Sequence, residues 1–489
     1  MSNYILTLKL DTEKYQEDIL NKRLEISRNI YNSCLGELFK RYNHMKESKQ
    51  YRKTLKLDKG KERNKEFNEL NKKYGLTEYS LHKYVKTMQK HFKNNIDSFT
   101  SQKIATRCFK AFEKLMFHKA NKVYFKRYGE MNSVEGKSNK TGIRFKDNEL
   151  IWNGLKIPII IKNNDIYAQM ALDNKIKYCR IVKKFIRGKY KYYVQLVLDG
   201  IPPIKVNRET GEIKNSIGCG NVGLDIGTQT IAISSIKEVK LLELAPEVNN
   251  IEKEKRVLMR KLDRQRRANN PNNFNNNGTI KKQGNKKVIW IKSNKYIKTQ
   301  NKLREIQRKQ TDIRKQSNEK LANYIISLGD RILVETMNYK GLQARTKETI
   351  INEKTGKYNK KKRFGKSLAN KAPSMFLTIL SNKLKYEGLE LLKINTYKVK
   401  ASQYNHINDE YIKKKLSDRW NDFNINGKEI KIQRDLYSAF IIQNVVGKKL
   451  DKLDKENIVK DFEGFKEFHD IEIERIKHSN NKLISSMGV

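Results

Sequence analysis

Hydrophobic positions along residues 12–45 recur at helical spacing and predict a long helix with one buried stripe. The stripe consists of residues three, four and seven positions apart: Leu20, Leu24, Tyr31, Leu35, Leu38 and Tyr42. A second helical pattern covers residues 78–122. Residues 46–76, between the two patterns, are polar and Lys-rich, and they predict an exposed connection or a short solvated helix. The first part of the chain is therefore expected to be mainly helical.

From residue 143 to residue 198 the pattern changes to short β-branched and aromatic runs, which predict strands. The clearest runs are residues 156–161 and 191–198, and the first ten residues show a strand pattern too. We therefore expect a small antiparallel β-unit that includes the N-terminal strand. The turn-rich stretch 201–220 predicts a boundary after it.

A second α/β unit is predicted from residue 221 onward. Strand patterns at 221–226, 229–236 and 239–244 are followed by a basic helix near 252–267, an Asn-rich loop through Asn285 and a second basic helix to about Leu328. Residues 251–320 contain 22 Lys and Arg against 6 Asp and Glu. This excess favours phosphate-binding helices over a purely structural helical hairpin. The fold class is thus α/β with several domains.

The charge of the whole chain points to a polyanionic partner. Among 489 residues, 104 are Lys or Arg and 54 are Asp or Glu, a formal net charge of +50. Self-repulsion of this size disfavours a compact state unless a polyanion neutralises it, and nucleic acid is the natural candidate. No apolar run reaches the roughly 18 residues of a membrane-spanning helix, and the N-terminus lacks a signal-peptide pattern. We expect a cytoplasmic bacterial protein without a membrane partner, whose four cysteines are buried apolar residues.

Three carboxylates interrupt apolar patterns in the second unit. Asp225 and Glu335 end predicted strands, and Asp435 begins an amphipathic helix. Such acids are costly to bury unless they are paired or bind cations. Together they would hold two Mg²⁺ ions about 4 Å apart for in-line phosphoryl transfer, with Mn²⁺ as a possible substitute. Each acid alone could be an ordinary turn or capping residue, but their order on a cationic chain favours a joint catalytic and metal-binding site.

The segments around these acids resemble the three RuvC motifs of RNA-guided nucleases. Residues 222–227 (VGLDIG) resemble the first motif, 332–338 (ILVETMN) the second and 433–439 (QRDLYSA) the third. Two further matching stretches lie between the second and third motifs, at 364–367 (FGKS) and 372–376 (APSMF). The ordered set resembles TnpB, the RNA-guided nuclease of insertion sequences and intron-associated elements, and its relatives, the compact type V CRISPR effectors. The resemblance covers residues 221–445, and the preceding half matches in layout only.

This resemblance implies an RNA-guided DNA endonuclease that cuts double-stranded DNA beside a short flanking motif by two-metal hydrolysis. The partners would be a structured guide RNA from or near its own locus and the DNA target, while the number of protein copies stays open. The implied domains are a wedge strand at 1–10, a helical recognition domain at 11–125, a β wedge domain at 126–205, a linker at 206–220, an RNase H-like RuvC nuclease with a basic helical insertion at 221–395, a target-nucleic-acid-binding module at 396–432, the third-motif helix at 433–450 and a C-terminal tail at 451–489.

Candidate nucleic-acid contacts come from two places. Arg434, beside Asp435, could touch the scissile strand or be an ordinary surface arginine. In the first half, one helical face offers polar and cationic groups suited to base edges and phosphates, and we expect it to read the flanking motif. Its members are Ser101, Gln102, Lys103, Thr106 and Arg107.

One departure from the TnpB pattern concerns zinc. Relatives usually carry a four-cysteine zinc ribbon before the third motif, but this chain has no cysteine after Cys219. The corresponding stretch, 402–420, contains a single histidine, His406. A lone histidine is more often a hydrogen-bonded residue than a ligand, so we predict no structural zinc.

Other classes of protein remain as alternatives. Residues 224–230 (LDIGTQT) also resemble the first phosphate loop of actin-like sugar kinases. A kinase would need a second phosphate loop and a Gly-rich adenosine motif, which are not apparent in the sequence. A catalytically weak RNA-guided repressor is the closer alternative, although the presence of all three acids favours cleavage. A single-strand transposase is disfavoured because no Tyr/His nucleophile arrangement is apparent.

Overall fold

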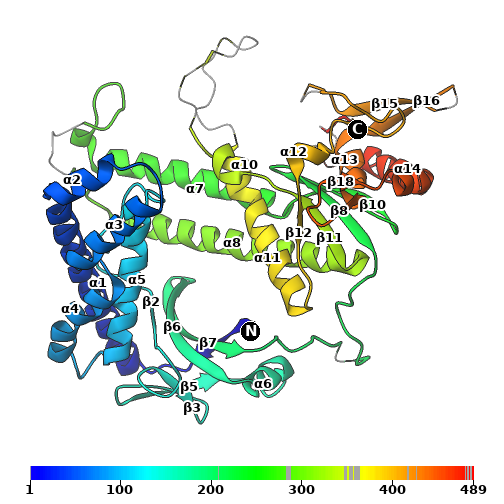
Figure 1. The fold of residues 1–489 in the computed structure, drawn as a ribbon. Coiled ribbons are helices and arrows are strands. Elements are labelled where there is room, and N and C mark those ends of the chain that lie inside the picture. The colour runs from blue at the N-terminus through cyan, green and yellow to red at the C-terminus, as the bar shows by residue number, and fades with distance from the viewer. Residues whose placement is uncertain are drawn as a thin grey trace. The chain divides into compact units, whose positions relative to one another are not determined.

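The computed structural model describes residues 2–207, 209–281, 288–345, 348, 350–351, 356, 364–415, 418–425, 427–479, 481, 484 and 487–489. The chain divides into two compact units, Met1–Ile204 and Lys205–Val489 (Figure 1). The division falls within the turn-rich stretch 201–220. Both units mix helices and sheets, so the expected α/β class with several domains is confirmed at this level. No helix in the described ranges has both the length and the apolar character to cross a bilayer.

The helices of the first unit follow the predicted periodicity with one difference. Helix α1 (Lys14–Glu47) buries the expected stripe, and the polar stretch after it forms α2 (Lys49–Lys56) and α3 (Lys61–Lys73). The pattern over 78–122 is two helices rather than one: α4 (Glu78–His91) and α5 (Ser98–Met116). The break occurs because the Asp97 carboxylate accepts the Thr100 N–H at 2.8 Å and so caps a new helix.

The sheet of the first unit has seven strands in the order β2-β6-β7-β1-β5-β4-β3. Strand β1 (Asn3–Leu10) lies between β7 and β5 and pairs antiparallel with both, so the prediction that the N-terminal strand joins this β-unit is confirmed. Its buried and exposed residues alternate, as one covered face requires. The other elements are β2 (Ser133–Glu135), β3 (Arg144–Lys146), β4 (Glu149–Trp152), β5 (Leu155–Ile160), α6 (Ile166–Leu172), β6 (Ile176–Ile186) and β7 (Lys189–Asp199).

The second unit contains a five-stranded sheet in the order β10-β9-β8-β11-β12. The three predicted strands are confirmed as β8 (Asn221–Ile226), β9 (Thr230–Ser235) and β10 (Val239–Glu243), joined antiparallel. Strand β11 (Arg331–Glu335) pairs parallel with β8, and β12 (Leu392–Ile394) pairs parallel with β11. Both faces of the sheet are covered, because alternate residues of its strands belong to two separate apolar clusters.

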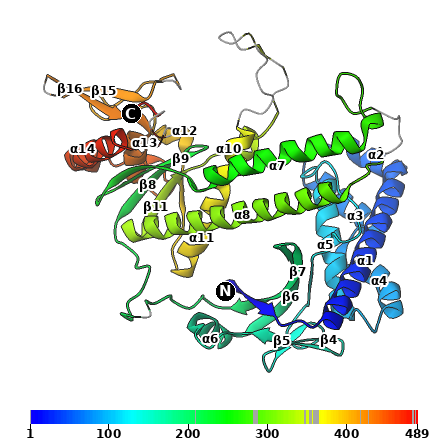
Figure 2. The ribbon, with the colours of Figure 1, turned by 180° about the vertical axis from the view of Figure 1, so that it is seen from behind.

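Helices cover the two faces of this sheet. On one side α8 (Asn294–Leu328) and α11 (Pro373–Tyr386) pack on β8 and β11, and on the other side α13 (Arg434–Gln443) and α14 (Lys455–Lys477) pack on β8, β9 and β10. Figure 2 shows α7 (Val248–Asn269) running beside α8. The two predicted basic helices are therefore confirmed. The shorter helices are α9 (Tyr339–Leu342), α10 (Gly365–Lys371) and α12 (Thr396–Val399).

The residues that we expected to form a C-terminal tail instead contribute to the core. Helix α14 buries Ile458, Phe462, Phe465, His469, Ile473 and Ile476, which recur at helical spacing. Three strand pairs precede it in the chain: β13 (Tyr404–Asn405) with β14 (Glu410–Tyr411), β15 (Trp420–Ile425) with β16 (Lys428–Gln433), and β17 (Val445–Val446) with β18 (Lys452–Leu453). The apolar period in 458–476 was the signal that the sequence offered for this helix.

Candidate active site

Asp225 and Glu335 stand at the same end of two neighbouring parallel strands. In the pairing of β8 with β11, Leu224 lies opposite Val334, so the next residue of each strand is one of the two acids. The carboxyl end of parallel strands is where open α/β sheets form their ligand-binding crevices. The two acids, 110 positions apart in the sequence, are thus brought to one edge by strand pairing.

Asp435 reaches the same edge because α13 lies directly on β8. A Cβ atom at Gly223 would lie 2.0 Å from the Ala439 carbonyl oxygen and 2.4 Å from the Gln443 amide nitrogen, so only glycine allows this approach. The Ser234 hydroxyl on β9 also donates to the Gln443 amide oxygen at 2.7 Å. These contacts hold the first turn of α13, which carries Asp435, over the end of β8.

The pKa shift of Asp225 has causes that link the three acids. Burial is the largest cause that raises the pKa of Asp225 well above its usual value, and the charges of Glu335 and Asp435 add to the rise. Ser438 and Arg434 oppose it. Burial also raises the pKa of Glu335. Like charges close together in a dry site favour the protonated form, so this group of acids is suited to bind cations.

A cavity of about 680 Å³ contains all three acids and several cationic side chains. The cationic residues that line it are Lys413, Lys414, Arg419 and Arg434. Arg419 Nη1 lies 3.9 Å from an Asp435 carboxylate oxygen. The sequence prediction did not single out Lys413, Lys414 or Arg419, although a run of three lysines at 413–415 was a visible signal.

Arg434 lines the same cavity, and its contact with the scissile DNA strand stays a prediction. Its side chain is largely buried, and Nη1 donates to the Asp418 carbonyl at 2.8 Å. Nη2 lies 3.4 Å from an Asp435 carboxylate oxygen. Arg434 therefore braces Asp435 and the loop before β15, while Arg419 is the more exposed of the two arginines.

The three acids provide the type of ligand that divalent cations prefer, but they are not close enough together to form a ready metal-binding group. In the described parts of the chain, no three His, Cys, Asp or Glu side chains lie together as a group that could hold a metal ion. Carboxylate oxygens are nevertheless the ligands that Mg²⁺ prefers. Burial and the charges of Glu335 and Asp435 raise the pKa of Asp225, and a bound cation would relieve the repulsion among these charges. Mg²⁺ at Asp225, Glu335 and Asp435 thus stays a prediction.

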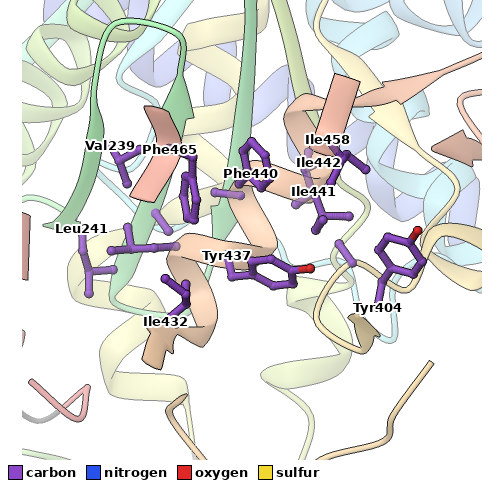
Figure 3. Close-up of a cluster of buried hydrophobic side chains, with 14 of the residues drawn as sticks. Val239, Leu241, Tyr404, Ile432, Tyr437, Phe440, Ile441, Ile442, Ile458 and Phe465 are labelled. Carbon is purple, nitrogen blue, oxygen red and sulfur yellow. The ribbon is translucent and has the colours of Figure 1, made fainter. Parts of the chain in front are cut away.

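The stretch around His406, for which we predicted no structural zinc, is held by aromatic packing. His406 Nδ1 lies 2.7 Å from the Tyr437 hydroxyl, and its ring lies 4.3 Å from that of Phe462 between centroids. Burial lowers the pKa of His406 to about 4. Figure 3 shows Tyr404, Tyr437, Phe440 and Phe465 in the same apolar cluster. His406 is thus half-buried and packs against the apolar cluster through Phe423, Tyr437 and Phe462.

Of the polar face predicted on α5, one residue is buried and the others lie in or beside a groove. Ser101 is fully buried, because it lies three, four and seven residues before Ile104, Ala105 and Cys108 on the apolar stripe. The prediction that Ser101 faces nucleic acid is therefore wrong. Lys103, Thr106 and Arg107 do line a groove of about 440 Å³ together with Lys110, Lys114 and Arg180. Gln102 is half-buried beside them.

Fold and site together define a mixed α/β protein of two units with an acidic, cation-lined cavity at the carboxyl end of a parallel strand pair. No family model and no curated protein matches the sequence. Among solved structures, the Cas12f1-sgRNA-target DNA complex aligns at 10% identity and a TM-score of 0.41, covering 91% of this chain and 99% of that one. A CRISPR-Cas12f ternary complex aligns at 13% identity and a TM-score of 0.26, covering 89% and 83%. At these TM-scores the chemistry of the site rests on its own residues.

Proposed function

We propose that this protein is an RNA-guided DNA endonuclease with a RuvC-like active site. The observation that carries the proposal is the convergence of Asp225, Glu335 and Asp435, from two strands and one helix, in one cavity. The sheet order, with three antiparallel strands followed by two parallel ones, is that of an RNase H-like core and supports the RuvC assignment. Cationic side chains in the same cavity favour a phosphodiester substrate.

The chain's own residues divide the work of the site. Asp225, Glu335 and Asp435 would hold two Mg²⁺ ions, which supply Lewis-acid stabilisation and an activated water for in-line attack. Lys413, Lys414 and Arg419 would bind the phosphates on either side of the scissile bond. Arg434 keeps Asp435 oriented through its own contacts with the loop before β15. Hydrolysis is expected to leave 5′-phosphate and 3′-hydroxyl ends.

Guidance by RNA is the part of the proposal supported by charge and by the motif resemblance. The net charge of +50 and the cationic α7–α8 pair fit a long polyanion better than a short DNA contact. The proposal includes the requirement for a short DNA motif beside the target. It covers both a TnpB-like nuclease and a compact type V effector, which would cut by the same mechanism. A guided repressor is the alternative if binding occurs without cleavage.

The decisive experiment is a paired assay on Asp225→Ala and Asp225→Asn. With guide RNA and a matched DNA target, both variants should bind in a gel shift but cut at least about 100-fold more slowly, because a neutral or missing side chain cannot offset two cations. Glu390→Gln, which changes an exposed acid outside the cavity, is the matched control. If Asp225→Ala cuts at the wild-type rate, the assignment of the active site is wrong. Cleavage without RNA overturns the guidance, and guided binding by a wild type that never cuts supports the repressor.

A further inference from the structure

A second feature suited to nucleic acid lies in the first unit, in the segment between α5 and β2. Residues 117–128, which we call the aromatic strap, present four large rings to solvent. The exposed fractions are 83% for Tyr128, 73% for Tyr124, 54% for Phe117 and 52% for Phe125. Single exposed aromatic residues are common on proteins, but four within twelve residues form a surface that calls for a partner.

Hydrogen bonds to α1 hold the backbone of the strap in place, so its rings are exposed on an ordered segment. The Asn32 side chain on α1 accepts the Lys126 N–H and donates to the Lys126 carbonyl, both at 2.8 Å. The Glu25 carboxylate accepts the Gly129 N–H at 2.7 Å. The Phe125 ring also lies 6.1 Å from that of Phe39. A backbone fixed in this way presents its rings without an ordering cost on binding.

The outermost rings are not used inside the described part of the chain. No hydrogen bond there involves the hydroxyl of Tyr124 or Tyr128, and neither ring stacks on another side chain. The fold therefore fixes their position and leaves their faces open. Since burying such rings would stabilise the free protein, their exposure fits a surface that is covered in a complex.

Within the strap the charge is of one sign, although the carboxylates of Glu130 and Glu25 border it by accepting the backbone N–H groups of Arg127 and Gly129. Residues 117–128 contain Lys119, Lys122, Lys126 and Arg127 but no Asp or Glu. Except for half-buried Lys126, these cations are exposed. The strap follows the end of α5 at Met116, and Lys114 before it and Met131 after it both line the basic groove of about 440 Å³ on α5. Open rings, exposed cations and a basic groove thus lie along one continuous piece of the chain.

We propose that the aromatic strap binds a single-stranded stretch of nucleic acid, with unpaired bases stacked on Tyr124 and Tyr128. Every base has a flat π-face, so stacking holds a strand with little regard to sequence, while Lys119, Lys122 and Arg127 contact its phosphates. An acidic peptide would match the charge, but its acidic side chains cannot stack on the two open rings as the base of every nucleotide can. RNA and DNA share the recognised chemistry, and the experiment separates them. The site lies in the first unit and does not depend on the proposed nuclease activity.

The test uses full-length protein carrying Asp225→Ala, so that cleavage cannot interfere. Single-stranded RNA and DNA oligonucleotides of about ten residues containing 5-iodouracil are crosslinked by light, and the modified peptides are mapped. We expect crosslinks at Tyr124 or Tyr128 in at least one arm, and the stronger arm identifies the natural strand. Crosslinks confined to other regions in both arms overturn the proposal.

A binding titration on matched variants gives an independent readout. Tyr124→Ala/Tyr128→Ala should weaken single-strand binding by about tenfold or more, with duplex binding and the salt dependence unchanged, because stacking releases no counterions. Tyr124→Phe/Tyr128→Phe should bind like the parent. Tyr15→Ala, which removes an exposed ring flanked by Glu13, Glu17 and Asp18, should change nothing. The proposal is overturned if the double alanine variant binds single strands as well as the parent does. It is also overturned if the variant loses duplex binding equally, or if it loses only the binding of an acidic peptide.

Discussion

His406 is a half-buried imidazole whose surroundings favour its neutral form. Burial lowers its pKa to about 4, and Nδ1 lies 2.7 Å from the Tyr437 hydroxyl. The Tyr437 hydroxyl also accepts the His406 backbone N–H at 3.2 Å, so it can donate its own proton to Nδ1. In the unfolded chain the pKa returns to about 6.5. Between these two values the unfolded chain binds a proton that the folded chain does not, so stability falls as the pH falls from about 6.5 toward 4.

We predict that His406→Phe reduces the acid sensitivity of the fold. Phenylalanine keeps a ring against Phe462 but has no proton to bind, so the drop in Tm between pH 7 and pH 5 should be smaller than in the wild type. At pH 7 the variant should be somewhat less stable, because one hydrogen bond is lost. Thermal melts at both pH values measure this. His478→Phe, at an exposed position, should leave the drop unchanged, and an equal drop in His406→Phe would contradict the assignment.

At the level of elements, the contact of α13 with β8 fixes where the third acid stands. Gly223→Ala would place a methyl group 2.0 Å from the Ala439 carbonyl oxygen, and a backbone atom cannot move away without the helix. We predict a loss of about 3 kcal/mol or more in the free energy of unfolding. Cleavage should also be lost in the variant that remains folded, because Asp435 shifts with α13. Denaturant unfolding and a cleavage assay at low temperature measure the two effects.

Gly464→Ala provides the matched control for that substitution. Gly464 lies within α14, and no heavy atom approaches its potential Cβ within 4 Å. Alanine there should leave cleavage unchanged and raise stability by up to about 1 kcal/mol, because glycine is the poorer helix former. If both glycine variants behave alike, the close approach of α13 to β8 is not what positions the site.

Helix α14 also packs against α13. The rings of Phe465 and Phe440 stack at 4.4 Å between centroids, and His469 Nε2 on α14 accepts the Gln433 N–H at 3.0 Å. We predict that Phe465→Ala costs about 3–5 kcal/mol and reduces cleavage, because a buried aromatic ring is lost next to the helix that carries Asp435. Ile471→Ala, at an exposed position on the same helix, is the control. Unfolding curves that match the wild type would show that α14 is dispensable.

For the whole molecule, the net charge of +50 is the dominant property. We predict that the protein freed of nucleic acid becomes more heat-stable as salt rises from about 0.05 to 0.3 M, because ions screen the self-repulsion. The protein bound to RNA should start at a higher Tm and lose part of that advantage over the same range, because salt weakens phosphate contacts. Melting curves of both forms measure this, and identical salt responses would contradict it.

The bound nucleic acid can be identified in the same preparation. Sequencing after stringent washing should recover a structured RNA that overlaps or neighbours the gene of this protein. Random cellular fragments would contradict the guided part of the proposed function, while leaving the electrostatic prediction intact.

The sequence by itself determined the elements whose signal is local. Alternating apolar residues predicted β1, and an apolar stripe predicted α1, because burial of one face imposes a period of 2.0 or 3.6. The two basic helices followed from composition in the same way. Asp225, Glu335 and Asp435 were noticed because each acid stands at the edge of an apolar pattern, at the end of a strand or the start of a helix, which is also a local property.

Only the tertiary structure decided which side chains meet. The shared cavity of the three acids depends on the pairing of β8 with β11 and on the approach allowed at Gly223, and both join residues more than 100 positions apart. The same long-range packing buried Ser101, placed Arg419 beside Asp435 and turned the expected tail into α14. Periodicity reports that a residue has a buried face, but the partner on that face is chosen by the competition among all apolar surfaces of the chain.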